Sequence, residues 1–360
     1  MTARQHRVAT SFFFFLLVTL VFLLSVSAGG VMSGEAAEGR QLFNLKPSKL
    51  LVFGDSYVDT GNIRKAISRS WKFPYGLTFP GKPTGRFSDG RVLTDYLARF
   101  IGVKSPIPYK WRKIGYKSVR YGMNFAYGGT GVFDTLAPLP NMTTQIDFLQ
   151  QILTQNTYSA WDLQSSVALV SVAGNDYSSY LARNGSLQDL PAFISQVVNQ
   201  TSKNLIRLHG AGVKKVMVTG LPPLGCLPAT TASNSFQQCD QSLNQLVTLH
   251  NLLLTQSVAA LNNATGGPTF VMLDMYGAFM AALQPPPNGN INNNKSALKP
   301  CCVGTSASDS CGSVDEDGGG RKRYTVCQDP EAAFFWDGVH PTQAGWRAVY
   351  STLKSNLMQL

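Results

Sequence analysis

Four short apolar runs, widely spaced along the chain, constrain the fold more than any other feature. They are Leu50 to Phe53, Val167 to Ala173, Val213 to Thr219 and Thr269 to Met275. Each run is rich in aliphatic side chains and ends near a glycine or aspartate, after which the sequence turns polar. A nearly continuous apolar run of this length is typical of a parallel strand that is buried on both faces.

Long amphipathic stretches alternate with these runs. Phe193 to His209, Cys239 to Leu261 and Thr342 to Leu360 carry apolar residues three and four positions apart, the spacing of one helix face. Strands that alternate with helices predict a three-layer α/β/α fold with a central parallel sheet, joined by right-handed crossovers. In such folds the functional site lies at the carboxyl ends of the strands.

The first 28 residues are typical of a secretory signal peptide. Arg4 and Arg7 precede an apolar core from Phe12 to Val26, and small residues follow it. The core has 15 residues, whereas a membrane-spanning helix needs about 20. We therefore expect cleavage after Ala28 and no stable membrane insertion afterwards, with an uncleaved signal anchor as the alternative.

No charge block or long linker divides the rest of the chain. We expect residues 29–46 to be a short leader and residues 47–360 to form a single domain. Within it, residues 285–324 are rich in proline and asparagine and then in cysteine and glycine. This composition predicts a surface excursion without regular elements.

Secretion predicts oxidised cysteines, and the chain has six, all outside the signal peptide. Cys226 and Cys239 are the simplest local pair. The other four crowd into a stretch rich in glycine and serine, where a zinc site is the alternative: Cys301, Cys302, Cys311 and Cys327. The only nearby histidine is His340 and no paired C-x-x-C spacing occurs, so disulfides are favoured and no metal is expected.

Five Asn-x-Ser/Thr sequons are candidates for glycosylation in a secreted protein. They are Asn141, Asn184, Asn199, Asn263 and Asn294. Each match involves only three residues, so chance is the alternative explanation. Together with the signal peptide and the cysteines, the sequons indicate an extracellular location.

The chain is basic, and its densest group of cations alternates with aromatic rings. The formal charge of +11 falls to about +9 when Arg4 and Arg7 leave with the signal. Residues 110–120 contain five Lys or Arg and two aromatic residues, a composition typical of surfaces that bind nucleic acid or acidic polysaccharide. We expect no nucleic acid in this compartment. A solvated loop or edge strand is expected here, with contact to an anionic wall polysaccharide as the alternative.

A candidate nucleophile, Ser56, directly follows the first apolar run in Gly54-Asp55-Ser56. A serine hydroxyl attacks well only when a neighbouring base takes its proton, so a histidine is required. His6 leaves with the signal, whereas His209 and His250 lie in amphipathic stretches where capping or packing explains them. His340 remains.

His340 lies in a loop that ends where Pro341 can open the last helix, and Asp337 precedes it by three residues. A carboxylate at that spacing can accept a hydrogen bond from Nδ1 of the imidazole while Nε2 takes the serine proton. We expect Asp55 to hydrogen-bond the backbone of its own turn. Asp59 is expected to start or cap a following helix.

Stabilisation of an oxyanion needs hydrogen-bond donors, and two further loops supply candidates. Asn175, in Gly174-Asn175-Asp176 after the second apolar run, carries an amide that no apolar environment explains. Residues 128–131 (Gly-Gly-Thr-Gly) allow the backbone to approach a ligand closely, although a tight turn alone explains such glycines.

Taken together, the four loops resemble the GDSL (SGNH) esterase/lipase family. Gly54-Asp55-Ser56, Gly128-Gly129, Gly174-Asn175-Asp176 and Asp337-Gly338-Val339-His340 occur in the order and spacing of that family. Three longer strings resemble its secreted plant branch: Gly-Arg-Phe-Ser-Asp-Gly from Gly85, Leu-Pro-Pro-Leu-Gly-Cys from Leu221 and Phe-Trp-Asp-Gly-Val-His-Pro-Thr from Phe335. The resemblance runs from about Leu50 to the carboxyl end.

The resemblance implies a flavodoxin-like fold and hydrolysis of carboxylic esters, including lipids, without metal or organic cofactor. By the family pattern Ser56 is the nucleophile, His340 the base and Asp337 its partner. The N–H groups of Ser56 and Gly129 and the amide of Asn175 then form the oxyanion hole. Tyr57 stands where the motif has leucine, and no Gly-x-Ser-x-Gly elbow of an ordinary α/β-hydrolase occurs.

Two other functions remain open. An acyltransferase would use the same residues, with an acceptor alcohol in place of water. A non-catalytic glycoprotein that binds a lipid or glycan is the other alternative, although it would not need Ser56, Asp337, His340 and Asn175 together. The expected substrate is an ester of a lipid, an acylated small molecule or a wall polymer.

Overall fold

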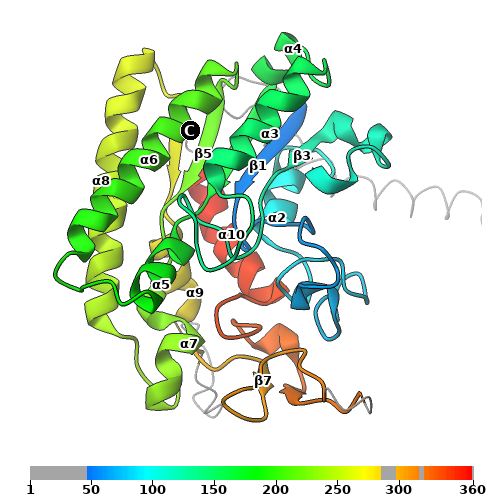
Figure 1. Ribbon diagram of the computed structural model, residues 1–360, viewed down its shortest axis with the longest axis vertical. Coiled ribbons are helices and arrows are strands. Elements are labelled where there is room, and N and C mark those ends of the chain that lie inside the picture. Colours follow the sequence, from blue (N-terminus) through cyan, green and yellow to red (C-terminus); the bar gives the residue numbers. More distant parts are fainter. Residues whose placement is uncertain (1–46, 285–296, 316–319, 359–360) are drawn as a thin grey trace, which may run out of the picture.

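The computed structural model describes residues 47–284, 297–315 and 320–358 (Figure 1). Its centre is a six-stranded sheet in the order β2-β3-β1-β4-β5-β6, with every neighbouring pair parallel. The strands are β1 Lys49–Gly54, β2 Ile107–Pro108, β3 Gly122–Asn124, β4 Ser166–Ser171, β5 Lys215–Thr219 and β6 Phe270–Leu273. The four predicted strands are confirmed. The sequence did not reveal β2 and β3, because two or three residues show no periodicity.

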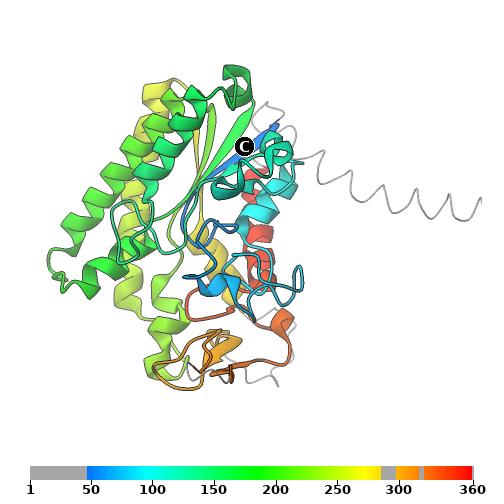
Figure 2. The same cartoon turned by 45° about the vertical axis from the view of Figure 1, so that its right-hand side comes forward.

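Side chains that alternate along these strands divide the core into two layers. One layer packs against α3 (Met142–Thr154), α6 (Leu190–Gly210) and α8 (Gln241–Thr265). The other packs against α2 (Leu93–Phe100), α9 (Met275–Leu283) and α10 (Gln343–Leu357). Figure 2 shows the two sets of helices on opposite faces of the twisted sheet. The predicted three-layer α/β/α fold, with its parallel central sheet, is confirmed.

The other elements are short. Three are helices: α4 Ala160–Gln164, α5 Gly174–Ala182 and α7 Pro228–Thr231. Single 3₁₀ turns occur at Arg69–Trp71, Tyr109–Trp111, Leu224–Cys226, Ala232–Asn234 and Pro330–Ala332, and a longer one at Tyr116–Tyr121. The basic segment 110–120 therefore lies in two turns between β2 and β3, as the loop interpretation expected.

Disulfides organise the region around the predicted excursion. The prediction that residues 285–324 hold no regular element was wrong, because β7 (Cys302–Gly304) pairs antiparallel with β8 (Tyr324–Val326). Bonds Cys301–Cys327 and Cys302–Cys311 hold this small sheet, and the predicted bond Cys226–Cys239 is confirmed. All six cysteines are thus paired, so the four cysteines of the excursion form disulfides and not the alternative zinc site.

Three sequence predictions concern residues outside the described ranges: the signal peptide and leader, residues 1–46, and the sequon at Asn294. The last helix begins at Gln343, two residues after Pro341, because the hydroxyl of Thr342 accepts from the Gly345 N–H and caps it. No helix in the described part of the chain is long and apolar enough to cross a membrane.

Candidate active site

The candidate nucleophile lies at the end of the central strand β1. Gly54 has φ of 141°, and a Cβ there would lie 1.9 Å from the carbonyl oxygen of Ser171 on β4, so only glycine fits. The buried amide of Gln145 on α3 accepts from the Gly54 N–H at 2.8 Å and donates to its carbonyl at 2.9 Å. These bonds fix the turn that presents Ser56.

Ser56, His340 and Asp337 form a continuous hydrogen-bonded chain. His340 Nε2 lies 2.8 Å from Ser56 Oγ, and its Nδ1 lies 2.8 Å and 2.9 Å from the two carboxylate oxygens of Asp337. All three residues are less than 9% exposed. Because a carboxylate can only accept a hydrogen bond, the nitrogen that faces Asp337, Nδ1, carries the proton. Nε2 is then the nitrogen that can accept the serine proton.

Opposing effects set the acidity of Asp337. Burial raises the pKa of its carboxyl, but the charge and hydrogen bond of His340, with hydrogen bonds from the Val339 N–H and the Tyr75 hydroxyl, together outweigh burial and hold the pKa below its usual value. The Val339 and His340 N–H groups, each 2.9 Å from Oδ1, act in the same direction. Asp337 is therefore a carboxylate throughout the neutral range.

Aromatic rings hold the imidazole in place. Phe87 stacks on the His340 ring with centroids 5.0 Å apart, and Tyr57 meets it edge-on at 6.0 Å. The Tyr57 hydroxyl also donates to the Val339 carbonyl at 2.8 Å. Tyr57, which departs from the motif's leucine, thereby joins the serine loop to the histidine loop.

Three donors converge where an oxyanion would form. The Asn175 amide, in the first turn of α5, donates one hydrogen to the Thr130 carbonyl at 2.9 Å and retains a second. The N–H groups of Ser56 and Gly129 donate to no acceptor within the described ranges, whereas Gly128 donates to Asp59. Ser56 is buried and Gly129 is half-buried, and both line the cavity that contains His340, so their N–H groups are the pair that an incoming oxyanion would satisfy.

Buried aspartates tie these loops together. Asp59 accepts from the N–H groups of Gly61, Asn62 and Gly128, so it closes its own turn and anchors the glycine loop. The prediction that it caps a helix was wrong, because no helix follows it. Asp176, the neighbour of Asn175, accepts from the N–H groups of Val132 and Phe133, which directly follow the glycine loop.

Asp55 behaves as predicted, since its carboxylate accepts from the Tyr57 N–H of its own turn at 3.0 Å. Burial raises the pKa of Asp55 to about 7, although the Tyr57 bond and the charge of His340 oppose that effect. Burial also raises the pKa of Asp59 and of Asp176 to about 6. These three aspartates belong to the sequence motifs, so the sequence could single them out. Their hydrogen-bond partners on other loops could be known only from the fold.

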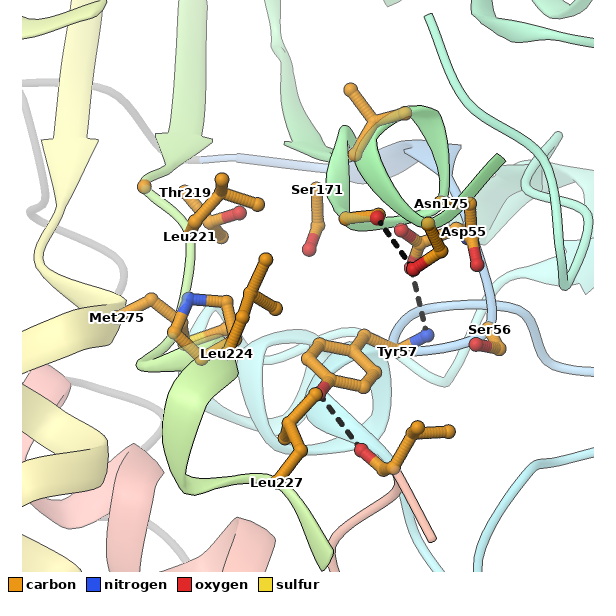
Figure 3. Close-up of a pocket in the computed structure, with 16 residues that line it drawn as sticks. Asp55, Ser56, Tyr57, Ser171, Asn175, Thr219, Leu221, Leu224, Leu227 and Met275 are labelled. Carbon is orange, nitrogen blue, oxygen red and sulfur yellow. Dashed lines mark hydrogen bonds between the residues drawn. The ribbon is translucent and has the colours of Figure 1, made fainter. Parts of the chain in front are cut away.

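Two cavities meet at Ser56. The larger has a volume of about 900 Å³ and includes Gly129, Asp337 and His340 in its lining. The smaller, shown in Figure 3, has a volume of about 80 Å³ and extends between the β1, β4 and β5 loops and α5. Within the described residues no group of three or more His, Cys, Asp or Glu could hold a metal ion. The geometry suits attack by a serine on a bound carbonyl group.

Comparisons with known proteins identify the family of the chain. The family model described as GDSL-like lipase/acylhydrolase matches residues 50–353. One GDSL esterase/lipase of Arabidopsis thaliana is 57% identical over 96% of this chain and 95% of its own. A second from the same plant is 53% identical over 94% and 97%. Acetylajmalan esterase 2 of Rauvolfia serpentina is 29% identical over 85% of this chain and 89% of its own.

Proposed function

This chain belongs to the GDSL-like lipase/acylhydrolase family and is an ester-hydrolysing serine hydrolase, and from that premise we propose that it cleaves carboxylic esters through an acyl-Ser56 intermediate. The observation that carries the proposal is the hydrogen-bonded chain from Ser56 through His340 to Asp337. The N–H groups of Ser56 and Gly129, which have no acceptor within the described ranges, complete the site. A serine with a base, an orienting carboxylate and an oxyanion site is equipped for acyl transfer.

The proposed reaction has two stages. Ser56 Oγ attacks the ester carbonyl while His340 Nε2 takes its proton, and the developing oxyanion accepts from Ser56 N–H, Gly129 N–H and the Asn175 amide. The imidazolium, stabilised by Asp337, then gives its proton to the leaving alcohol. Water enters, His340 removes its proton, and the same sequence releases the carboxylic acid and frees Ser56.

The test is hydrolysis of p-nitrophenyl acetate and butyrate by the secreted protein, with Ser56→Ala as the matched variant. We expect turnover by the wild type and, after rapid acid quenching, a peptide containing Ser56 that is heavier by one acyl group. Rates no faster than those of Ser56→Ala would contradict the proposal.

Secretion and glycosylation are part of the proposal. In this account cleavage after Ala28 releases the mature chain to the apoplast or cell wall, with residues 47–360 as one folded domain. Three disulfides and the exposed positions of Asn184, Asn199 and Asn263 support it. Amino-terminal sequencing of the secreted protein and mass loss after deglycosylation test it, and intracellular retention would contradict it.

The basic segment 110–120 suits contact with an anionic wall polysaccharide. Its cations lie over aromatic rings, with Arg112 3.9 Å from the Tyr109 ring centroid and Arg120 4.8 Å from that of Tyr121. Such pairs hold charge at the surface without neutralising it. A polygalacturonate column eluted with salt tests the contact, and absence of retention at low salt would rule it out.

A further inference from the structure

The two cavities at Ser56 differ about tenfold in volume and have little in common. Their linings share only Ser56, Asn175 and Val339. An ester that reacts with Ser56 has two substituents on its carbonyl, an acyl chain and an alcohol. Each must lie in one of the spaces that open at the serine, so the geometry of proton transfer decides which substituent takes which cavity.

The position of His340 shows which cavity the alcohol occupies. It must protonate the leaving oxygen, so the alcohol has to lie on the side of the imidazole. The large cavity is lined by His340 and Asp337, whereas neither residue lines the small one. The alcohol therefore belongs in the large cavity and the acyl chain in the small one.

Leucine side chains limit the small cavity on one side. Leu221 and Leu224 form one wall, as Figure 3 shows, and behind them lies a separate apolar void of about 10 Å³ between α5, α6 and α8. A cavity of roughly 150 Å³ accommodates benzene. A volume of about 80 Å³ therefore holds roughly three carbons beyond the carbonyl.

The large cavity has room for a much bulkier group. Most of its side chains are apolar, among them Ile63, Phe87, Leu139, Phe236 and Val303. Arg69 adds a cation at an exposed position of the lining. Such a surface stabilises a large apolar alcohol by removing its carbon skeleton from water.

We propose that this enzyme is selective for esters of a short acyl group, of two to roughly four carbons, with a bulky and predominantly apolar alcohol. The inference rests on the proposed function and deepens it, since it names the substrate class of the same site. It assigns Leu221 and Leu224 as the residues that limit acyl length.

The first experiment separates the two substituents. Acetate, butyrate and octanoate esters of ethanol and of 2-(2-naphthyl)ethanol, whose leaving alcohols have similar acidity, are compared by kcat/KM. We expect a fall of at least about tenfold from butyrate to octanoate and a rise of similar size from ethyl to naphthylethyl. A preference for octanoate over butyrate, or for ethyl over naphthylethyl, would overturn the inference. Failure to hydrolyse any of the esters would instead refute the proposed esterase.

Variants then test the wall itself. Leu224→Ala opens the small cavity into the apolar void, so the octanoate-to-acetate ratio of kcat/KM should rise at least about tenfold. Leu246→Ala is the matched control, because Leu246 lines the void but not the small cavity. It removes the same atoms and leaves the wall closed, so the ratio should stay within about twofold. Equal ratios in the two variants would contradict the assignment.

A second variant, which narrows the small cavity, tests the inference even if Leu224→Ala does not fold. Gly174 lines the small cavity, and a Cβ added there meets only Leu224, at an ordinary contact distance of 3.8 Å, so a larger side chain at this position should reduce the cavity. Gly174→Val should lower kcat/KM for butyrate more than for acetate, by at least about threefold. An unchanged ratio in a variant with the wild-type melting temperature would overturn the inference.

Discussion

The hydroxyl of Tyr75 donates a hydrogen bond of 2.7 Å to Oδ2 of Asp337, which lies 262 residues away in the sequence. Tyr75 is 4% exposed and packs edge-on against Phe87 and Trp336. Since the Val339 N–H donates to Oδ1, this bond means that both carboxylate oxygens have a partner besides His340. Tyr75 is therefore a positioning residue for Asp337, the partner of the proposed base, and its segment belongs to the candidate site.

Replacing Tyr75 with phenylalanine removes that bond and little volume. The Tyr75 bond helps to lower the pKa of Asp337, so its loss raises that pKa. Activity should fall by about 3- to 30-fold, and the loss on acidification should begin at a higher pH. Tyr324→Phe is the matched control, because the Tyr324 hydroxyl contacts the Phe73 carbonyl in the same cluster and not Asp337. The same pH profile in both variants would refute the role of Tyr75.

His340→Ala removes the proposed base, whose Nε2 contacts Ser56 Oγ. We expect kcat to fall by at least ~10³-fold with p-nitrophenyl butyrate, because the serine then has no group to take its proton. Thermal melting should confirm that the variant is folded. His250→Ala is a useful comparison, since His250 pairs with the Tyr177 hydroxyl away from the serine. Its effect should be on stability and not on kcat.

Asn175→Ala removes a side-chain donor from the proposed oxyanion site. We expect kcat to fall roughly 10²-fold with little change in KM, because the bond strengthens as negative charge develops. Asn262→Ala is the control: its amide bonds the Phe270 backbone at β6, so it should lose stability and keep kcat. A change below about threefold in Asn175→Ala would exclude it from the oxyanion hole.

The buried carboxyl of Asp55 makes stability depend on pH. Its folded pKa of about 7 is above the ordinary value of 3.8, so the folded state binds the extra proton between these values. This contribution to stability is present at pH 4 and below and is lost as the pH rises through 7. In Asp55→Asn the fall in melting temperature from pH 5 to pH 8 should shrink by about 3–8 °C. An unchanged fall would contradict the assigned pKa.

The disulfide Cys301–Cys327 supports the histidine loop as well as the small sheet. The N–H groups of Cys301 and Cys302 donate to the carbonyls of Phe335 and Trp336, directly before Asp337. The paired change to serine should cost about 3 kcal/mol in the free energy of unfolding. It should also lower kcat at 25 °C, where the protein stays folded. Calorimetry and p-nitrophenyl acetate assays measure the two effects, and full kcat with lost stability would limit the bond to a structural role.

How much the sequence predicted depends on how local each contact is. The strands β1, β4, β5 and β6 and the long helices follow from periodicity, which neighbouring residues create. The contact between Asp337 and His340 follows from a spacing of three within one loop. By contrast, β3 forms only because β1 offers it an edge, and β2 only because β3 offers the next one. Asp59 accepts from the Gly128 N–H across the site instead of capping a helix.

The sequence by itself determined the layers of the fold and the local contact of Asp337 with His340, and it singled out the candidate serine. Only the tertiary structure decided that Gly129 and not Gly128 has an unpaired N–H, that Tyr75 contacts Asp337, and that two unequal cavities meet at Ser56. The reason is physical. Periodicity and short spacing depend on chain geometry, whereas hydrogen-bond partners and cavity walls depend on how distant segments pack.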